Sequence, residues 1–307
     1  MSKVLFMSSR PLARAENLKA VYDMYDGEKA YHRGFIGGKM PPGDWSLLVI
    51  DELPAASPGK CIMITHGIPG GKTYGMDQPN PYIRPGLIDY AITSSEETIP
   101  LVAKQMCLDE SKVLPLGMPR TDKYFQKQPR IEQRKLYLYC PTFRGRNDSR
   151  FPYINYGEIN KWLYDDEVMY IKPHMLTGPL KIPTTIFKHL ETFDPMIPTH
   201  PYLMSCDVLI TDFSSIVYDA HVLNKPVVLF AKDRYEYLNK RGMYHKYPND
   251  YASRFTMDEH ELVNLCREAY KNGPTKRDKE IKKRFTNKCD GHSTERVVEL
   301  INQVLKS

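Results

Sequence analysis

Short apolar runs, rich in β-branched and aromatic residues, recur along this chain and alternate with segments of helical or irregular pattern. The expected strands are residues 4–8, 47–50, 61–65, 90–95, 113–118, 135–140, 168–174, 207–212 and 226–231. The expected helices are residues 13–25, 96–107, 157–164, 215–224, 258–272 and 293–306. Strands that alternate with helices form mostly parallel sheets with helices on both faces. The sequence therefore predicts an α/β fold.

The polar run DKYFQKQPRIEQRK, residues 122–135, interrupts this alternation. A chain of 307 residues is long enough for two domains that each bury a core. We therefore expect two Rossmann-like domains, residues 1–125 and 126–292, with this run as the linker. Ligands bind at the carboxyl ends of the strands in such sheets. Because the distinctive motifs follow strands in both halves, we expect two parallel sheets that face each other across one cleft.

Composition narrows the class of protein. The chain has 41% hydrophobic and 26% charged residues, as globular proteins do, and no apolar run long enough to span a bilayer. Its start reads as a first strand rather than a signal peptide. Six scattered cysteines without a CxxC pair favour a reduced, cytoplasmic chain. The net charge of +6 suits an anionic substrate or membrane surface, but the basic residues are dispersed, so we expect no nucleic-acid partner.

The stretch ITHGIPGGKTYG, residues 64–75, looks at first like a phosphate-binding P-loop. The spacing excludes this interpretation, because His66 stands where that motif has its first glycine. Prolines at positions 79, 81 and 85 also argue against the helix that must follow a P-loop. What remains is a loop with His66 at its tip and Lys72 behind it. His66 is either a general base, since its ordinary pKa of about 6.5 is close to working pH, or a core or capping histidine.

The segment DVLITDFSSIVYDAHVLNKPVVLF, residues 207–230, holds the strongest phosphate-binding pattern. Thr211 lies at the end of an expected strand, and Ser214 and Ser215 lie where the next expected helix begins. Free backbone N–H groups and the helix dipole favour an anion there, and Asp219, one turn further, can accept hydrogen bonds from a ribose. In the alternative interpretation these residues only cap the helix and Asp219 is a solvated surface charge. We predict a nucleotide diphosphate site.

Positive groups follow two other expected strands. Arg144 follows residues 135–140, and Lys172 and His174 lie at the end of residues 168–174. The arginine fork can bind phosphate through two N–H groups, and the lysine and the histidine add a charge and a donor. Each residue by itself fits an ordinary surface charge or loop histidine. Together with the serine turn they predict a phosphate-binding cluster.

The acidic run Asp165-Asp166-Glu167 resembles a metal-binding cluster. It ends the expected surface helix NKWLYDDE, so we interpret all three carboxylates as a solvated face.

The order of the motifs resembles that of the CDP-glycerol glycerophosphotransferases, the bacterial family that includes teichoic-acid primases and polymerases. The matching stretches are HG (66–67), GMPRTD (117–122), PTFR (141–144), KPH (172–174), TDFSSI (211–216), KP (225–226), DRYEYLNKRGMY (233–244) and DGHSTERV (290–297). They reach from near residue 61 to the C-terminus. One such motif is weak evidence, but the whole set in the same order is strong evidence. The chain departs from the family where Thr65 replaces a common tryptophan and where Gly70 and Gly71 lengthen the loop before Lys72.

The resemblance implies a GT-B fold, with the acceptor toward residues 1–125 and the nucleotide in residues 126–292. It also implies that a C-terminal helix, residues 293–307, packs back toward the N-terminal domain. The implied activity is transfer of glycerol phosphate from CDP-glycerol to an acceptor hydroxyl, with release of CMP and without a metal or cofactor. The acceptor would be a lipid-linked saccharide or a growing polymer. The enzyme would be cytoplasmic, with peripheral contact at the inner face of the membrane.

The same resemblance assigns roles to individual residues. The expected catalytic residues are His66, as the base, and His174, which also matches a donor-phosphate position. Other residues are expected to bind the donor or the acceptor. They are Lys72, Arg144, Lys172, Thr211, Ser214, Ser215, Asp219 and Arg241. Asp219 matches the carboxylate that contacts the ribose.

Two other classes of function stay open. Another GT-B enzyme would move a sugar or a different alditol phosphate, such as ribitol phosphate, and would differ only in the pocket beyond the β-phosphate. A non-catalytic binder of nucleotides or anionic polymers would have no need of an unprotonated His66 opposite the phosphate site. The acceptor and the number of successive transfers also stay open.

Overall fold

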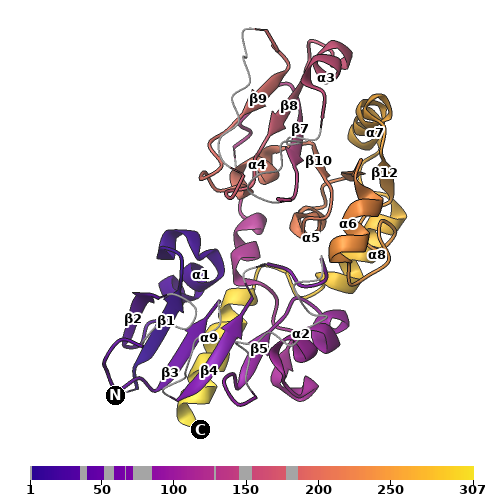
Figure 1. The fold of residues 1–307 in the computed structure, drawn as a ribbon. Helices are drawn as coiled ribbons and strands as arrows, with labels where there is room; N and C mark the ends of the chain where they lie inside the picture. Colours follow the sequence, from indigo (N-terminus) through magenta and orange to yellow (C-terminus); the bar gives the residue numbers. More distant parts are fainter. Residues whose placement is uncertain are drawn as a thin grey trace. The chain divides into compact units, whose positions relative to one another are not determined.

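The computed structural model describes residues 2–34, 40–51, 59–65, 67–71, 85–127, 129–144, 154–177 and 186–307. The described strands form two six-stranded sheets in which neighbouring strands are parallel. Each sheet belongs to its own compact unit (Figure 1): unit 1 is residues 1–126 with 283–307, and unit 2 is residues 127–282. The predicted α/β fold with two parallel sheets is confirmed. The cleft and the expected domain boundaries stay predictions.

The sheet of unit 1 has the strand order β2-β1-β3-β4-β5-β6. Its strands are β1 (Val4–Ser8), β2 (Lys29–Arg33), β3 (Leu47–Ile50), β4 (Lys60–Ile64), β5 (Tyr90–Ile92) and β6 (Val113–Leu114). The described α-helices of this unit are α1 (Glu16–Met24), α2 (Ile99–Met106) and α9 (Ser293–Lys306). Short 3-10 helices span Leu12–Arg14, Glu96–Thr98, Glu110–Lys112 and Pro119–Phe125.

The sheet of unit 2 has the strand order β12-β11-β10-β7-β8-β9. Its strands are β7 (Lys135–Cys140), β8 (Glu167–Ile171), β9 (Leu190–Thr192), β10 (Val208–Thr211), β11 (Val227–Phe230) and β12 (Arg254–Thr256). The described helices here are α3 (Tyr156–Trp162), α4 (His200–Ser205), α5 (Ile216–Val222), α6 (Arg234–Arg241) and α7 (Glu259–Asn272). Helix α8 (Lys276–Phe285) runs from unit 2 into the C-terminal part of unit 1.

The strands β2, β9 and β12 lie outside the strands that the sequence predicts. Each of them is an edge strand of its sheet. No side chain of β2 is fully buried, and β9 and β12 are only three residues long. A continuous apolar run marks a strand that is covered on both faces and both sides. These three strands lack such a run because part of their surface stays in water, whereas the fourth edge strand, β6, has one and was predicted.

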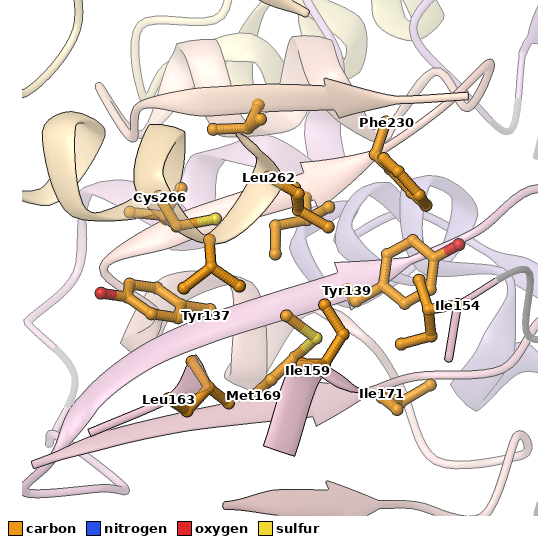
Figure 2. Close-up of a cluster of buried hydrophobic side chains, with 14 of the residues drawn as sticks. Tyr137, Tyr139, Ile154, Ile159, Leu163, Met169, Ile171, Phe230, Leu262 and Cys266 are labelled. Carbon is orange, nitrogen blue, oxygen red and sulfur yellow. The ribbon is translucent and has the colours of Figure 1, made fainter. Parts of the chain in front are cut away.

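The core of unit 2 lies between its sheet and helices α3 and α7 (Figure 2). Tyr137 of β7 and Met169 of β8 are buried with Ile159 of α3. Leu262 and Cys266 of α7 join the same cluster, and their spacing of one turn places both on one face of the helix. Burying apolar side chains of this size stabilises the fold by about 1.5–3 kcal/mol each. The core therefore fixes the sheet whose strand ends carry the unit 2 motifs.

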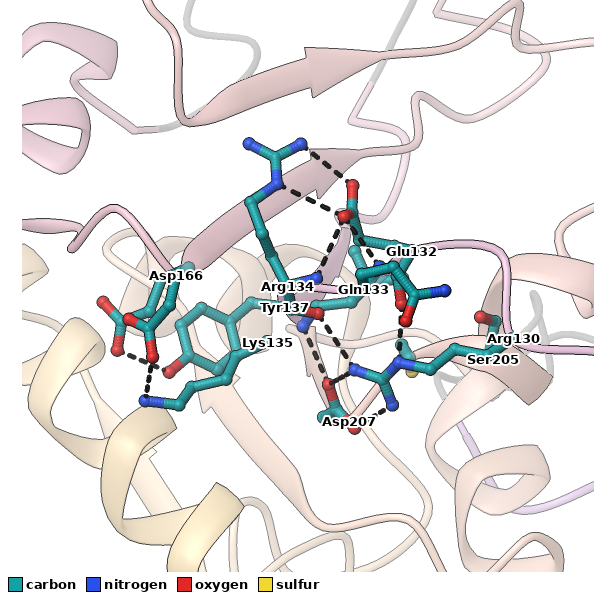
Figure 3. Close-up of polar contacts among 12 residues, drawn as sticks. Arg130, Glu132, Gln133, Arg134, Lys135, Tyr137, Asp166, Ser205 and Asp207 are labelled. Atoms are coloured by element: carbon teal, nitrogen blue, oxygen red, sulfur yellow. Dashed lines mark hydrogen bonds and ion pairs between the residues drawn. The ribbon is translucent and has the colours of Figure 1, made fainter.

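The last part of the expected linker is anchored to unit 2 (Figure 3). Two nitrogens of the Arg130 guanidinium donate to the carboxylate of Asp207 at 2.9 and 2.7 Å, and Asp207 also accepts the N–H of Leu136 at 2.8 Å. Nearby, Glu132 accepts a hydrogen bond from Arg134 at 2.9 Å. This segment is thus held at the amino end of β7 by charged hydrogen bonds.

Helix α9 is built into unit 1 by the two motifs that contain Asp122 and Ser293. The carboxylate of Asp122 accepts the N–H groups of Ser293 and Thr294 at 3.1 and 2.7 Å. Arg296 donates to the carbonyl oxygen of Leu116 at 2.9 Å. The GMPRTD and DGHSTERV stretches therefore meet in space and hold the C-terminal helix. Across the described part of the chain, none of the helices is both long and apolar enough to cross a bilayer.

Candidate functional site at the strand ends of unit 2

The unit 2 motifs follow four adjacent strands, β11, β10, β7 and β8. Arg144 follows β7, and Lys172 follows β8 directly. Ser214 follows β10, and Asp233 follows β11. Because these strands are parallel, their carboxyl ends lie at one edge of the sheet, where ligands of α/β proteins bind. The structure thus brings most of the predicted donor-side residues to one edge.

Asp212 links the loops that follow β7 and β10. Its buried carboxylate accepts the N–H of Thr142, after β7, at 2.8 Å. It also accepts the N–H of Phe213, in its own loop, at 2.6 Å. The preceding Thr211 donates its hydroxyl to the carbonyl oxygen of Cys140 at 2.7 Å and is fully buried. Both side chains therefore fix the backbone around the site. Substrate binding by Thr211 stays a prediction.

The guanidinium of Arg144 is held by two carboxylates. Its Nε and Nη2 each donate to Asp233 at 2.9 Å, and its Nη1 donates to Asp212 at 2.5 Å. The side chain is only 4% exposed and packs against the stacked rings of Phe213 and Tyr237. Burial by itself would lower the pKa of Arg144, but Asp212 and Asp233 raise it above the ordinary value. Phosphate binding by Arg144 stays a prediction.

Lys172 is a buried cation whose described hydrogen bonds run to carbonyl oxygens. Its Nζ donates to the carbonyl oxygens of Pro195 at 2.9 Å and Pro173 at 3.4 Å. Among the ion pairs of the described residues, none involves this ammonium group. Burial lowers the pKa of Lys172. The loop after β8 therefore holds a buried positive charge outside the described ion pairs, and the carboxylate that acts on it electrostatically is that of Asp194.

His174 faces the loop that follows β7. Its ring stacks on that of Phe143, with the ring centres 5.6 Å apart and the planes 24° from parallel. Its Nδ1 accepts the N–H of Leu176 at 3.2 Å. When Nδ1 accepts, a neutral His174 carries its proton on Nε2, which is then the donor nitrogen. The geometry suits a residue that donates to an oxygen at this edge of the sheet.

Helix α5 begins directly after Ser214 and Ser215. The hydroxyl of Ser214 accepts the N–H of Ile216 at 3.4 Å, and Ser215 occupies the N-cap position without a capping bond from its side chain. Asp219 is only 3% exposed. The alternative interpretation of Asp219 as a solvated surface charge is therefore wrong. Ligand contacts by Ser214, Ser215 and Asp219 stay predictions.

Two of the other predicted residues cannot be placed, and a third, Arg241, acts on the cluster through its charge, which opposes the rise that burial causes in the pKa of Tyr237. His66 and Lys72 lie outside the described residues. Arg241 is the last residue of α6 and is exposed. Their roles as base and substrate ligands stay predictions.

Sequence reasoning did not single out Asp233, Tyr237 and Tyr247 as site residues. Asp233 could have been found, because it comes shortly after the expected strand 226–231, as Asp212 ends another. Tyr237 lies in the matching stretch 233–244, but Tyr247 carried no such signal, and the places of both rings depend on packing against Phe213, at ring-centre distances of 3.8 and 5.0 Å. Within the described residues, neither buried tyrosine hydroxyl has a hydrogen-bond partner. Both hydroxyls are thus donors that a polar group at the site could use.

A model of the family described as CDP-glycerol:poly(glycerophosphate) glycerophosphotransferase matches residues 50–303. The chain belongs to this family. A glycerophosphotransferase relative, the teichoic acid glycerol-phosphate primase of Bacillus subtilis (strain 168), is 24% identical over 94% of this chain and 77% of its own length. The teichoic acid ribitol-phosphate primase of Bacillus spizizenii is 26% identical over 71% of this chain and 60% of its own length. The chain is thus similar to enzymes of teichoic acid synthesis, and the predicted resemblance to this phosphotransferase family is confirmed.

Solved structures confirm the GT-B type of fold. A variant of the wall teichoic acid polymerase TagF, soaked with CDPG, matches with a TM-score of 0.79 at 18% identity, covering 99% of this chain and 89% of that chain. A complex of S. aureus MnaA with UDP matches with a TM-score of 0.56 at 13% identity, covering 100% and 97% of the two chains. At these identities the likeness concerns the fold alone.

Proposed function

We propose that this protein transfers glycerol phosphate from CDP-glycerol to an acceptor hydroxyl and releases CMP. Membership of the glycerophosphotransferase family carries the proposal. The arrangement of Lys172, His174 and the Ser214–Ser215 turn at one sheet edge in unit 2 supports it. The acceptor is a hydroxyl of a lipid-linked saccharide or of a growing polymer. The protein then works in the cytoplasm at the inner face of the membrane.

In the proposed reaction, the acceptor oxygen forms a bond to the β-phosphorus of CDP-glycerol while the bond between that phosphorus and the CMP oxygen breaks. The acceptor proton passes to His66, whose role rests on the family resemblance. CMP leaves with the electron pair of the broken bond and so gains a negative charge. Donors that are already in place where charge develops give a large part of enzymatic rate enhancement.

Two groups on the loop after β8 can stabilise the negative charge that develops on the leaving CMP. Lys172 brings a buried ammonium that is bonded to carbonyl oxygens and lies outside the described ion pairs, so its positive charge can act on an anion at the strand ends. His174 presents Nε2 as a donor when its Nδ1 accepts the N–H of Leu176. We propose that the transfer needs no metal, because these groups and the backbone N–H groups at Ser214 and Ser215 neutralise the leaving phosphate.

CDP-ribitol is the second candidate donor. The observation that favours it is the ribitol-phosphate primase relative, which at 26% identity over 71% of this chain is about as similar as the glycerol-phosphate primase, at 24% over 94%. The two donors share the nucleotide and the pyrophosphate, so the same strand-end groups serve both.

The test is to incubate the protein with CDP-glycerol, CDP-ribitol or UDP-N-acetylglucosamine, together with a lipid-linked saccharide acceptor, and to measure release of the nucleoside phosphate. We expect CMP release from CDP-glycerol that persists in EDTA. Replacing His66 by Ala should lower turnover about 100- to 10,000-fold and leave CMP affinity unchanged. His174→Ala should weaken CMP binding as well.

CMP release from CDP-ribitol alone would establish the second candidate. Release of UDP alone, or binding of CMP without turnover of any donor, would contradict the proposed function.

A further inference from the structure

A buried arginine joins three loops of unit 2. Arg144 itself lies in the loop after β7 and donates to the carbonyl oxygen of Thr142 in that loop at 2.6 Å. It also donates to Asp212 in the loop after β10 and to Asp233 in the loop after β11. Asp212 in turn accepts the N–H of Thr142. The backbone of Thr142 is therefore fixed from both its N–H and its carbonyl side.

The charges around Arg144 do not suit a phosphate ligand. One guanidinium faces the two carboxylates of Asp212 and Asp233 within 2.9 Å, so these three described groups together carry no excess positive charge. A phosphate that approached would have to displace a carboxylate and would meet like charges in a buried site, where such repulsion is strong. The side chain is also only 4% exposed.

The loops that this cluster joins carry the residues of the proposed donor site. Phe143, between the fixed Thr142 and Arg144, stacks on the ring of His174. Phe213, directly after Asp212, precedes the Ser214–Ser215 turn. Fixing both loops to one guanidinium sets the distance between these two groups.

We propose that Arg144, Asp212 and Asp233 form a positioning cluster. The cluster holds His174 and the Ser214–Ser215 turn at the spacing that the donor phosphates need, and does not itself contact these phosphates. The inference rests on the proposed function for its link to the donor. The geometry of the fork matters, because a guanidinium can bind one carboxylate through two nitrogens and still reach the second.

The direction in which Asp233→Asn changes CMP affinity distinguishes a positioning role of Arg144 from direct phosphate binding. We expect Asp233→Asn and Arg144→Gln each to weaken CMP binding and to raise the donor KM about 10- to 100-fold, since a displacement of about 1 Å can cost about 100-fold. The acceptor KM should not change. The double variant should be no worse than the worse single variant, because both remove the same contact. If Asp233→Asn binds CMP as tightly as wild type or tighter, the freed guanidinium is a phosphate ligand and the inference is wrong.

Two further variants control for charge and for folding. Arg144→Lys keeps the charge but loses the fork, so we expect a loss close to that of Arg144→Gln; recovery to near wild type would contradict the inference. Asp165→Asn, which removes a carboxylate that is 89% exposed and pairs with Lys188, should behave as wild type. Circular dichroism establishes that each variant is folded.

Hydrogen exchange tests the cluster without any turnover. In Asp233→Asn, amide exchange should become faster in residues 141–144 and 211–216 and stay unchanged in residues 47–50 of unit 1. Unchanged exchange in residues 211–216 would overturn the inference. A wild-type protein that turns over no CDP-alditol would instead refute the proposed function and leave this exchange result standing.

Discussion

Arg144 and Lys172 are buried cations at the carboxyl ends of the strands of unit 2, and different groups compensate their charges. Arg144 faces two carboxylates, whereas Lys172 has two carbonyl oxygens and a pKa that burial lowers. A buried charge without a counter-ion costs free energy of folding. Groups whose pKa is shifted by such burial are concentrated at functional sites. We therefore expect Lys172 to be a residue at which this protein gives up stability for anion binding.

Replacing Lys172 by Met tests this trade-off. At pH 7 we expect a higher free energy of unfolding, because the burial cost of the ammonium is gone, and a CMP affinity about tenfold lower, or about 1.4 kcal/mol. The folded-state pKa of Lys172 lies below 10.5, so the cost is present at neutral pH and disappears as the pH rises through the folded-state pKa toward 10.5. The gain from Lys172→Met should thus shrink in alkaline solution. Urea denaturation at several pH values and calorimetry measure both effects.

Lys188→Met is the matched control, since Lys188 is 68% exposed and pairs with the exposed Asp165. Lys188→Met should change neither the free energy of unfolding nor the CMP affinity. A Lys172→Met protein that binds CMP normally would contradict the role of Lys172.

At the scale of elements, helix α9 depends on one close approach between backbones. Gly117 has a positive φ of +87°, and a Cβ atom there would lie 2.1 Å from the carbonyl oxygen of Lys288. The same segment carries Asp122, which caps the helix at Ser293 and Thr294. The start of α9 is therefore set by contacts more than 150 residues apart in sequence, such as Asp122 with Ser293.

We expect Gly117→Ala to lower the free energy of unfolding by about 1–3 kcal/mol more than Gly86→Ala does. Gly86 is a matched control, because its φ is also +87° but its added Cβ would meet nothing within 4 Å. Both variants thus carry the strain of a left-handed backbone, and only Gly117→Ala adds a steric clash. Denaturant unfolding of the two variants gives the difference, and equal losses would show that the close approach to Lys288 is not needed.

The linker segment around Glu132 should contribute less to stability in acid. Hydrogen bonds from Arg134, together with one from Tyr170, lower the pKa of Glu132 from 4.5 to about 2 against the opposing effect of burial. A lowered folded-state pKa stabilises the fold above pH 4.5, and this contribution is lost as the pH falls from 4.5 through about 2.

We expect Glu132→Gln to lower the free energy of unfolding by about 1–3 kcal/mol at pH 7, with a smaller difference from wild type at pH 3. Denaturant titrations followed by tryptophan fluorescence at the two pH values measure it. A difference that stays constant from pH 7 to pH 3 would show that the ion pairs of Glu132 contribute nothing.

At the scale of the whole molecule, the chain consists of two units with separate sheets and separate buried clusters. Every donor-side residue that the structure describes lies in unit 2, at the ends of its strands. A nucleotide that binds one unit stabilises that unit by mass action and the other only through coupling between them.

CMP at about 100 times its Kd should therefore stabilise unit 2 by up to about 2.7 kcal/mol. Hydrogen exchange should slow in residues 127–282, above all near residues 172–174 and 211–219, and much less in residues 1–126. Protection that is centred on unit 1 would contradict the placement of the nucleotide.

Local pattern determined the class of fold and the order of its motifs. Central strands such as β3 and β10 are buried on both faces, so their apolar runs could be identified without knowledge of their neighbours. Apolar spacing predicted the helices α1, α2, α3, α5, α7 and α9, but not α4, α6 or α8, and the parallel sheets followed from the alternation. The motifs after the strands predicted which residues meet at the sheet edge, because parallel strands end on one side.

Tertiary structure alone decided the charge states and surroundings of individual residues. Glu167, which the sequence placed on a solvated face with the exposed Asp165, is fully buried and accepts hydrogen bonds from Arg267, 100 positions later in the chain. Arg144 meets Asp233 in the same way, across 89 positions. The solvent exposure and pKa of a charged side chain depend on partners that only the packed chain supplies, and no local pattern in the sequence records them.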